Sequence, residues 1–476
     1  MKWLIHRKNI IVMASMALFH FLFLGIEFLF DDCLAGIGAG SAEVVTAQNL
    51  MLGISVLGYL LYPVLSDFLF PILGKRIAEV VQFLVPVVCF LLVLGSVYVI
   101  QTGTTYAVIF WAGAVCFLVL GYFGNGVCFL ATQVITDFRY LARVAGFSYA
   151  LGVSLQYIHT NLMSSSLSKL LMLVVGSFGF IVLLFWQKTK PERNLGVLCR
   201  EQRETFEINK PVVGGFLLIA CVLLMTCLFS TLDNAVTLVH SSGEFNIGQW
   251  PRLILAVSGL AAGFLYDICN RRYMTHMMYL ISILAVIAIV ILAFDGSFLI
   301  GLIMFYVSAG FFVVFFTSGF MDMSVHCRHP KLWAGLGRGI NNLCALITSA
   351  ISVALLASDS IVIMIVALAL LGLLSVVLLG YERQLHWNEK KEDKDTSLIP
   401  QERDVSLFAK EYALTEREEE LLRIFLQSED AVQEVAAQMA ISRAALYRHI
   451  QALNEKTGTK TRVGIVQCFY QWNQKK

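Results

Sequence analysis

Apolar residues run along the first 381 positions in stretches of about 20, broken by short polar segments. A helix needs about that many residues to cross the hydrocarbon core of a bilayer, and the alternation of a membrane strand is absent. The pattern predicts about twelve transmembrane helices, six on each side of a polar stretch, "QKTKPERNLGVLCREQRETFEINKP". The first six are expected at Ile10–Asp31, Val44–Val64, Val80–Ile100, Tyr106–Leu130, Val144–Leu162 and Leu167–Trp186. The second six are expected at Val212–Asp233, Ile247–Asp267, Met274–Phe294, Phe298–Phe320, Ala334–Ala357 and Ile361–Tyr381.

Basic residues gather on one side of these spans, and such loops stay in the cytoplasm. That side holds the six basic residues of the polar stretch together with Lys2, Arg7, Lys8, Lys75, Arg76, Arg139, Arg143, Arg271, Arg272, Arg328, Lys331 and Arg338. The other side has only Lys169 and Arg252. The asymmetry places both termini in the cytoplasm and supports an even number of spans.

Composition agrees with an integral membrane protein, because 58% of the 476 residues are hydrophobic and only 14% are charged. The eleven cysteines show neither a CxxC pair nor metal-ligand spacing, so they are interpreted as small hydrophobic residues. No cofactor, metal or disulfide framework is expected.

The segment "GFLYDICNRR", at positions 263–272, resembles the cytoplasmic loop signature of the major facilitator superfamily. The resemblance implies a twelve-helix, all-α membrane domain of two halves. Gly263 lets helices approach closely, while Asp267, Arg271 and Arg272 can hold helix ends together in one conformation, so these four residues form a predicted conformational clamp. The alternative is a polar loop that only sets topology. The equivalent segment of the first half keeps Asp67 with wider spacing.

Polar side chains within the spans are costly and are therefore candidates for ligand binding. In the superfamily the first, fourth, seventh and tenth helices line a central cavity. The candidates for a small polar or cationic ligand are Glu27, Asn125, Gln156, His159, Asp233 and Asn341. The alternative interpretation of each residue is that it lies at a solvated loop end or forms a contact between helices.

After Tyr381 the composition changes, and positions 382–404 are predicted to be a solvated cytoplasmic linker. A separate helical domain is predicted at 405–476. In "LTEREEELLRIFLQ", Thr415 and Glu418 form a capping box. In "ISRAALYRHIQALNEKTG", Ser442 is expected to cap a helix that Gly458 ends. A short helix before this one and another after it complete four helices in a helix-turn-helix order.

This tail resembles the LuxR-type DNA-binding domain over about 60 residues, in a pattern that includes Thr415, Glu418, Val435, Ser442 and Gly458. The resemblance implies a bacterial inner-membrane protein whose helix at 442–457 enters the DNA major groove. The residues predicted to contact DNA are Arg443, Tyr447, Arg448, Gln451, Lys456, Lys460 and Arg462. A homodimer is a further expectation, because paired recognition helices are common.

Two functions follow from these features. The first is a membrane-tethered one-component transcriptional regulator, in which a major-facilitator-like sensor responds to a small molecule and the tail binds DNA. The alternative is a secondary transporter of the major facilitator type with a regulatory cytoplasmic tail. A third hypothesis is that the tail is an interaction module that does not bind DNA. No enzyme is expected, since the sequence has no nucleotide-binding loop and no nucleophile paired with a base.

Overall fold

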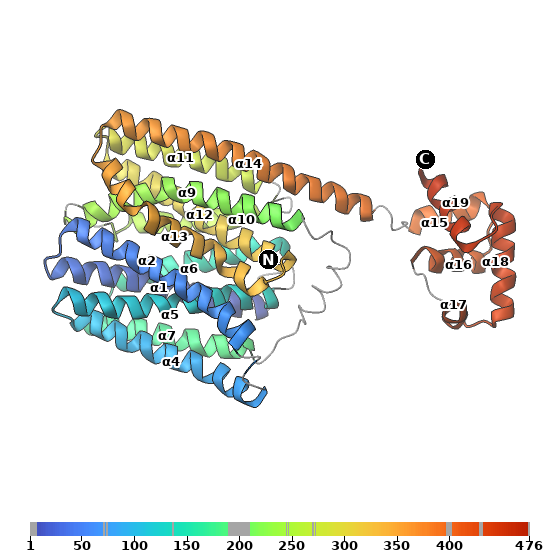
Figure 1. The fold of residues 1–476 in the computed structure, drawn as a ribbon, viewed down its shortest axis with the longest axis horizontal. Coiled ribbons are helices and arrows are strands. Elements are labelled where there is room, and N and C mark those ends of the chain that lie inside the picture. Colours follow the sequence, from blue (N-terminus) through green and yellow to red (C-terminus); the bar gives the residue numbers. More distant parts are fainter. Residues whose placement is uncertain are drawn as a thin grey trace. The chain divides into compact units, whose positions relative to one another are not determined.

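The apolar runs of the sequence fold as long helices, and the computed structural model contains no strand in the residues that it describes (Figure 1). Described are residues 7–474 except 70, 71, 73, 74, 136, 137, 189–209, 244, 246, 269, 270, 272, 397–401 and 428–431. Most of the polar stretch between the halves therefore lies outside the described residues. The chain divides into two units, Met1–Glu382 and Arg383–Lys476.

The described residues of the membrane unit form twelve long helices in two sets of six. The first set is α1 (Arg7–Gly36), α2 (Ser41–Val64), α4 (Lys75–Thr102), α5 (Tyr106–Val134), α6 (Leu141–Asn161) and α7 (Ser166–Lys188), with a π-turn η1 (Leu65–Leu69) and a 3₁₀ turn η2 (Phe138–Tyr140). The second set is α9 (Lys210–Ser241), α10 (Pro251–Tyr266), α11 (Met274–Ala293), α12 (Phe298–His326), α13 (Pro330–Leu356) and α14 (Ser360–Thr396).

Ten of these helices are long and apolar enough to cross a membrane. The two that fall short are α10, which is apolar but has only 16 residues, and α6, which carries polar residues such as Gln156 and His159. About twelve spans were expected, and ten helices have the length and composition of a span. Successive helices run in alternate directions, so α1 begins and α14 leaves at the same end of the bundle (Figure 1).

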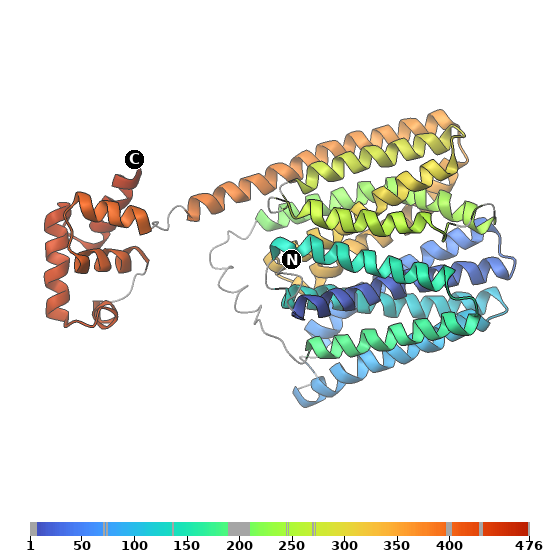
Figure 2. The same cartoon turned by 180° about the vertical axis from the view of Figure 1, so that it is seen from behind.

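The helices form an inner and an outer group. In α1, 78% of the most apolar segment is buried within the protein, against 22% in α14 and 28% in α4. Figures 1 and 2 show α14 beside α11 at one edge of the bundle, and α4 beside α7 at the other. The outer helices α4, α7, α11 and α14 therefore offer most of their apolar surface to lipid.

The two halves meet where α6 crosses α10, and small residues make the crossing close. A Cβ atom on Gly146 of α6 would lie 2.5 Å from the Gly259 carbonyl oxygen and 2.8 Å from the Gly263 Cα of α10. Without a hydrophobic driving force between helices in lipid, such close packing is a main source of association. Gly263, predicted to allow a close helix approach, lies at this crossing.

The region expected to be a linker is partly helical. Helix α14 continues past the apolar segment to Thr396, and α15 (Glu402–Glu411) begins the tail unit. The charged segment up to Thr396 continues the helix started by the apolar run before it, and the linker over 382–404 stays a prediction.

The tail unit has five described helices instead of the four expected. They are α15, α16 (Glu416–Gln427), α17 (Val432–Gln438), α18 (Arg443–Thr457) and α19 (Arg462–Gln474). Phe408 of α15 packs in the same core as Leu421, Leu446, Leu453 and Phe469. Helix α15 was missed because its apolar residues are few and follow a strongly charged segment.

We expect the Gly146→Ala substitution to push α6 away from α10 and to destabilise the membrane unit by about 1–3 kcal/mol, because an added Cβ meets backbone atoms. The measurement is the thermal unfolding of the detergent-purified protein. The control is Gly372→Ala in α14, where an added Cβ meets nothing within 4 Å. Equal melting temperatures for the two variants would contradict the close crossing.

Candidate functional site

Asp267 joins the two halves at the end of the bundle where α1 begins. It follows α10 in the second half, and its two carboxylate oxygens accept the backbone N–H groups of Ala142 at 3.1 Å and of Arg143 at 2.9 Å. These amides belong to the first turn of α6 in the first half. A helix N-terminus has unpaired N–H groups and a partial positive charge, so it is a favourable partner for a buried carboxylate. The Arg143 side chain adds an ion pair, with Nε 3.6 Å from Asp267 Oδ2.

A second contact between the halves repeats this arrangement. Asp67, in the turn after α2, accepts from the Lys331 ammonium at 2.6 Å. Lys331 lies in the first turn of α13, in the second half. The two carboxylates are thus placed equivalently, although the sequence spacing around Asp67 departs from the pattern around Asp267.

The other predicted clamp residues have different places. Arg271 adopts a left-handed conformation, with φ 68°, and its Nη2 lies 3.1 Å from Asp322 Oδ1 of α12. It therefore joins two helices of the second half and does not cross to the first. Arg272 lies outside the described residues.

Arg252 is a buried cation that sequence reasoning assigned to a loop. It lies in the first turn of α10, where its Nε donates to Gln156 Oε1 at 3.1 Å and its Nη1 lies 3.5 Å from the Tyr306 hydroxyl. Its guanidinium carbon lies 4.9 Å from the centre of the Phe28 ring. The interaction with Gln156 joins the halves within the bundle.

Arg338 is a second cation inside the bundle, partly buried, that was misplaced as a loop residue. It lies eight residues after the start of α13, about 12 Å along the helix axis. Its guanidinium carbon is 5.2 Å from the centre of the Phe23 ring and 5.5 Å from that of Phe316. Both arginines fall inside segments that the apolar pattern predicts to be spans, and a charge inside a span was the signal that could have found them.

Two acidic ligand candidates share this region. Glu27 of α1 accepts from Gln48 Nε2 at 3.1 Å and interacts electrostatically with Asp233, Arg252 and Arg338. Asp233 of α9 interacts with Arg252. We call Glu27, Asp233, Arg252, Arg338 and Gln156 the central polar cluster. It draws its members from α1, α6, α9, α10 and α13 of both halves.

The remaining ligand candidates do not belong to the central polar cluster. Asn125 donates to the Tyr59 carbonyl at 2.7 Å, and Asn341 accepts from Thr226 at 3.1 Å and donates to Asn342 at 3.2 Å. These contacts hold helices together, as the alternative interpretation expects. His159 packs edge-on against Phe21 near the end of α6, with ring centres 6.0 Å apart.

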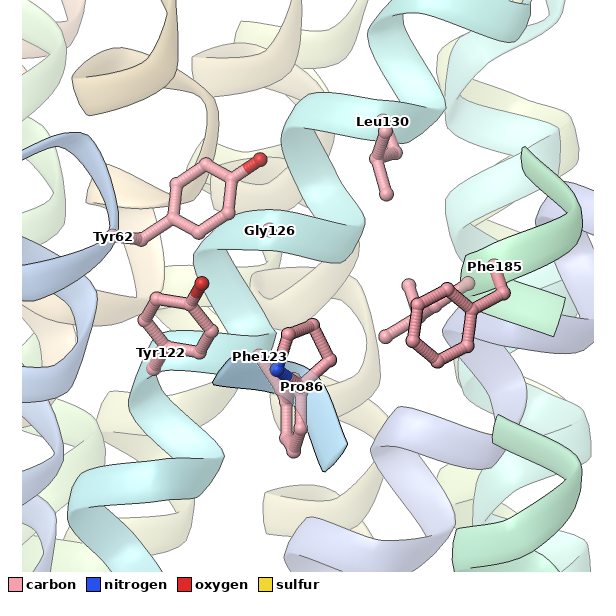
Figure 3. Close-up of a pocket in the computed structure, with 8 residues that line it drawn as sticks. Tyr62, Pro86, Tyr122, Phe123, Gly126, Leu130 and Phe185 are labelled. Atoms are coloured by element: carbon pink, nitrogen blue, oxygen red, sulfur yellow. The ribbon is translucent and has the colours of Figure 1, made fainter. Parts of the chain in front are cut away.

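An apolar pocket lies within the first half, away from the charged residues (Figure 3). It is lined by Tyr62, Pro86, Tyr122, Phe123, Gly126, Leu130, Leu184 and Phe185. These residues come from α2, α4, α5 and α7, and none of them belongs to the central polar cluster. The pocket therefore adds no polar group to the site.

Helix α18 of the tail unit has the N-cap and the C-cap that its sequence predicts. The Ser442 hydroxyl accepts the Ala445 N–H at 3.2 Å, and Gly458 ends the helix in the left-handed region at φ 68°. Leu446 and Leu453 are buried beneath it. Arg443, Tyr447, Arg448 and Lys460 are exposed, and Gln451 donates to Glu455 at 3.1 Å.

Two of the predicted DNA contacts are engaged within the chain. The Lys456 ammonium donates to Glu418 at 2.6 Å and to the Ala413 carbonyl at 2.9 Å. The Arg462 guanidinium lies over the Phe425 ring at 4.5 Å. Both cations therefore have packing roles, and DNA contact by any of the seven residues stays a prediction.

The capping box at the start of α16 shares its carboxylate with Lys456. Glu418 accepts the Thr415 N–H at 2.7 Å while the Thr415 hydroxyl lies 3.4 Å from the Glu418 nitrogen. Burial raises the pKa of Glu418, but the hydrogen bonds from Lys456 and Thr415 outweigh burial, so the pKa is lowered from its ordinary value. The glutamate is thus held in its charged form.

Comparison with known proteins supports the fold of the membrane unit. No protein-family model matches the chain, and no curated protein matches it. Among solved structures, the human organic anion transporter MFSD10 (TETRAN) is similar, with a TM-score of 0.51 at 15% identity over 80% of this chain and 99% of that one. An auto-inhibited POT family peptide transporter has 12% identity, a TM-score of 0.49 and coverage of 80% and 97%. A mutant of the nucleoside transporter NupG has 14% identity, a TM-score of 0.43 and coverage of 79% and 100%.

These findings correct the expected function. The membrane unit has the fold of a solved transporter structure, that of MFSD10, over 80% of this chain. The prediction of a membrane-tethered transcriptional regulator is contradicted, and the transporter alternative is favoured. The prediction was wrong because it took the function of the whole chain from the last eighth of the sequence.

We expect Glu418→Gln to destabilise the start of α16 by about 1–3 kcal/mol near neutral pH, because it removes the charge paired with Lys456. The lowered pKa means that the native carboxylate stabilises the fold above its ordinary pKa and loses this effect as the pH falls through the lowered value. Variant and native protein should therefore converge at acid pH. The measurement is amide hydrogen exchange in α16 of the full chain, with the exposed Glu420→Gln as control; equal exchange in both variants would refute the role of Glu418.

Proposed function

We propose that the chain is a secondary transporter of the major facilitator type, with its C-terminal unit as a regulatory cytoplasmic tail. The observation that carries the proposal is the placing of charged groups between the two halves. A central polar cluster draws on both halves, and two carboxylate contacts tie the halves together at one end of the bundle.

The carboxylate contacts suit an alternating-access cycle. Asp267 holds the N-terminus of α6, and Asp67 holds Lys331 at the start of α13, so both must break if the halves rock apart at this end. Each contact stabilises one conformation only, which is the property that a two-state transporter needs. The glycine crossing of α6 and α10 provides a close surface about which the halves can move.

The proposed membrane orientation follows from the distribution of basic residues. The end of the bundle that holds Asp67 and Asp267 also carries Arg143, Arg271 and Lys331. Basic loops stay in the cytoplasm, so we place this end, both termini and the tail there. We propose the inner membrane of a bacterium as the location.

The substrate is proposed to bind at the central polar cluster, which includes Glu27, Gln156 and Asp233 among the candidates named from the sequence. Asn125, Asn341 and His159 are proposed as flanking groups. The cycle includes binding and a conformational change, and no catalytic step is proposed.

We expect the purified protein in proteoliposomes to accumulate at least one compound from a defined mixture of organic acids, amino acids, nucleosides and amines. Asp267→Asn removes the charge that faces the α6 N-terminus, so accumulation should fall about tenfold, which corresponds to roughly 1.4 kcal/mol of altered conformational balance. The measurement is mass spectrometry of the vesicle contents under an imposed proton gradient.

The control is Glu79→Gln, which changes a carboxylate to an amide at an exposed position of α4. It should transport like the native protein. If protein-loaded vesicles take up no more of any compound than empty vesicles do, the chain is not a transporter of these classes.

A further inference from the structure

Arg338 differs from Arg252 because Glu27 interacts with it electrostatically but forms no ion pair with it. Within the described part of the chain it makes no ion pair, and its buried Nη2 atom has no hydrogen-bond partner. A buried guanidinium with free N–H groups is costly unless an anion or an acceptor completes it. The environment of Arg338 therefore points to a missing anionic partner.

Two aromatic rings lie against the guanidinium of Arg338. The Phe23 ring of α1 lies 5.2 Å from the guanidinium carbon, and the Phe316 ring of α12 lies 5.5 Å from it. Such cation–π contacts do not satisfy the N–H groups, so the N–H edge of the guanidinium still needs an acceptor. That edge matches the two oxygens of a carboxylate, which accepts parallel hydrogen bonds in the plane of the guanidinium.

Two further buried groups near Arg338 can donate hydrogen bonds and lack partners. They are the Tyr59 hydroxyl of α2 and Nδ1 of His20 of α1, and both side chains interact electrostatically with Arg338. A Cβ on Gly339, next to Arg338, would lie 3.7 Å from the Tyr59 Cβ. His20 precedes Phe23 by three residues, so the two lie on one face of α1.

The acidic residues of the central polar cluster are arranged around Arg252 instead. Asp233 interacts electrostatically with Arg252 and not with Arg338, and Asp31 interacts with neither arginine. Glu27 interacts with both. Glu27 is thus shared between two cations, and the unpartnered Nη2 atom of Arg338 can still donate to an incoming anion.

We propose that Arg338, Tyr59 and His20 form the subsite for the carboxylate group of a small organic anion, with Phe23 and Phe316 against its apolar body. The inference rests on the proposed transport function and names its substrate class. Asn125 lies beside Gly335, one turn from Arg338 along α13. Its unpartnered Oδ1 would accept from a hydroxyl or amide of the same solute.

The site also connects binding to motion. Phe23 and Tyr59 belong to the first half, whereas Arg338 and Phe316 belong to the second. A carboxylate that bridges them stabilises a closed arrangement of the halves around the solute. Binding of the anion and the conformational change are then parts of one equilibrium.

The first test is thermal unfolding of the full-length, detergent-purified protein with benzoate as the probe. Benzamide and benzylamine have the same ring with a neutral and a cationic group, and sodium chloride controls for a simple halide. We expect benzoate alone to raise the melting temperature, in proportion to its affinity for the folded state.

The variants assign the effect to the subsite. Arg338→Gln should weaken benzoate binding about tenfold to a hundredfold, Tyr59→Phe should weaken it by a smaller factor, and Arg338→Lys should retain part of it. Arg76→Gln, at an exposed position, should bind like the native protein. Because Arg338→Gln removes a charge that forms no ion pair and whose buried Nη2 atom has no partner, this variant should fold without the probe at least as well as the native chain.

Three outcomes would overturn the inference: no shift with benzoate, an equal shift with benzylamine or sodium chloride, or unchanged benzoate affinity in both Arg338→Gln and Tyr59→Phe. Measurements of uptake into proteoliposomes distinguish the failure of this inference from the failure of the transport proposal. Proteoliposomes that accumulate only amines or nucleosides would preserve transport and exclude the anion. Arg338-dependent benzoate binding with no accumulation of any compound would preserve the subsite and exclude transport.

Discussion

The carboxylate of Asp267 at the N-terminus of α6 is the interaction on which the arrangement of the two halves depends. A bilayer offers no water to buried polar groups, so the free amides of a helix start and a buried carboxylate are each costly alone and favourable together. The bond reaches from the second half to the first, and the contact of Asp67 with Lys331 repeats it in the opposite direction. Gly146 and Gly263 allow the approach that brings Asp267 to the first turn of α6.

Deeper in the bundle the same constraint gives two arginines different roles. Arg252 is satisfied by Gln156 and Tyr306 and has carboxylates nearby, so it connects helices of the two halves. Arg338 lies against two aromatic rings, and one of its nitrogens is left without a hydrogen-bond partner. A cation whose hydrogen bonds are made within the protein stabilises the bundle. A cation with an unpartnered nitrogen is suited to binding a ligand.

In the tail unit, local sequence patterns predict the helix ends but not the partners of two cations. The capping box of Thr415 and Glu418, the Ser442 cap and the Gly458 terminus were all predicted correctly, because each depends on residues within one helical turn. Lys456 and Arg462 were assigned to phosphate contact, yet they pack against Glu418 and Phe425. Those partners are more than thirty residues away in the chain, so no local pattern could reveal them.

The sequence by itself determined that the chain is a helical membrane protein with a separate charged tail, because apolar run length and composition decide whether a segment belongs in lipid. It also identified Asp267 and Gly263 through a short signature. Only the tertiary structure decided that Arg252 and Arg338 lie inside the bundle, which side chains surround them, and which helices Asp267 and Asp67 join. Those facts depend on side chains brought together from helices far apart in the chain, whereas hydropathy measures each segment alone.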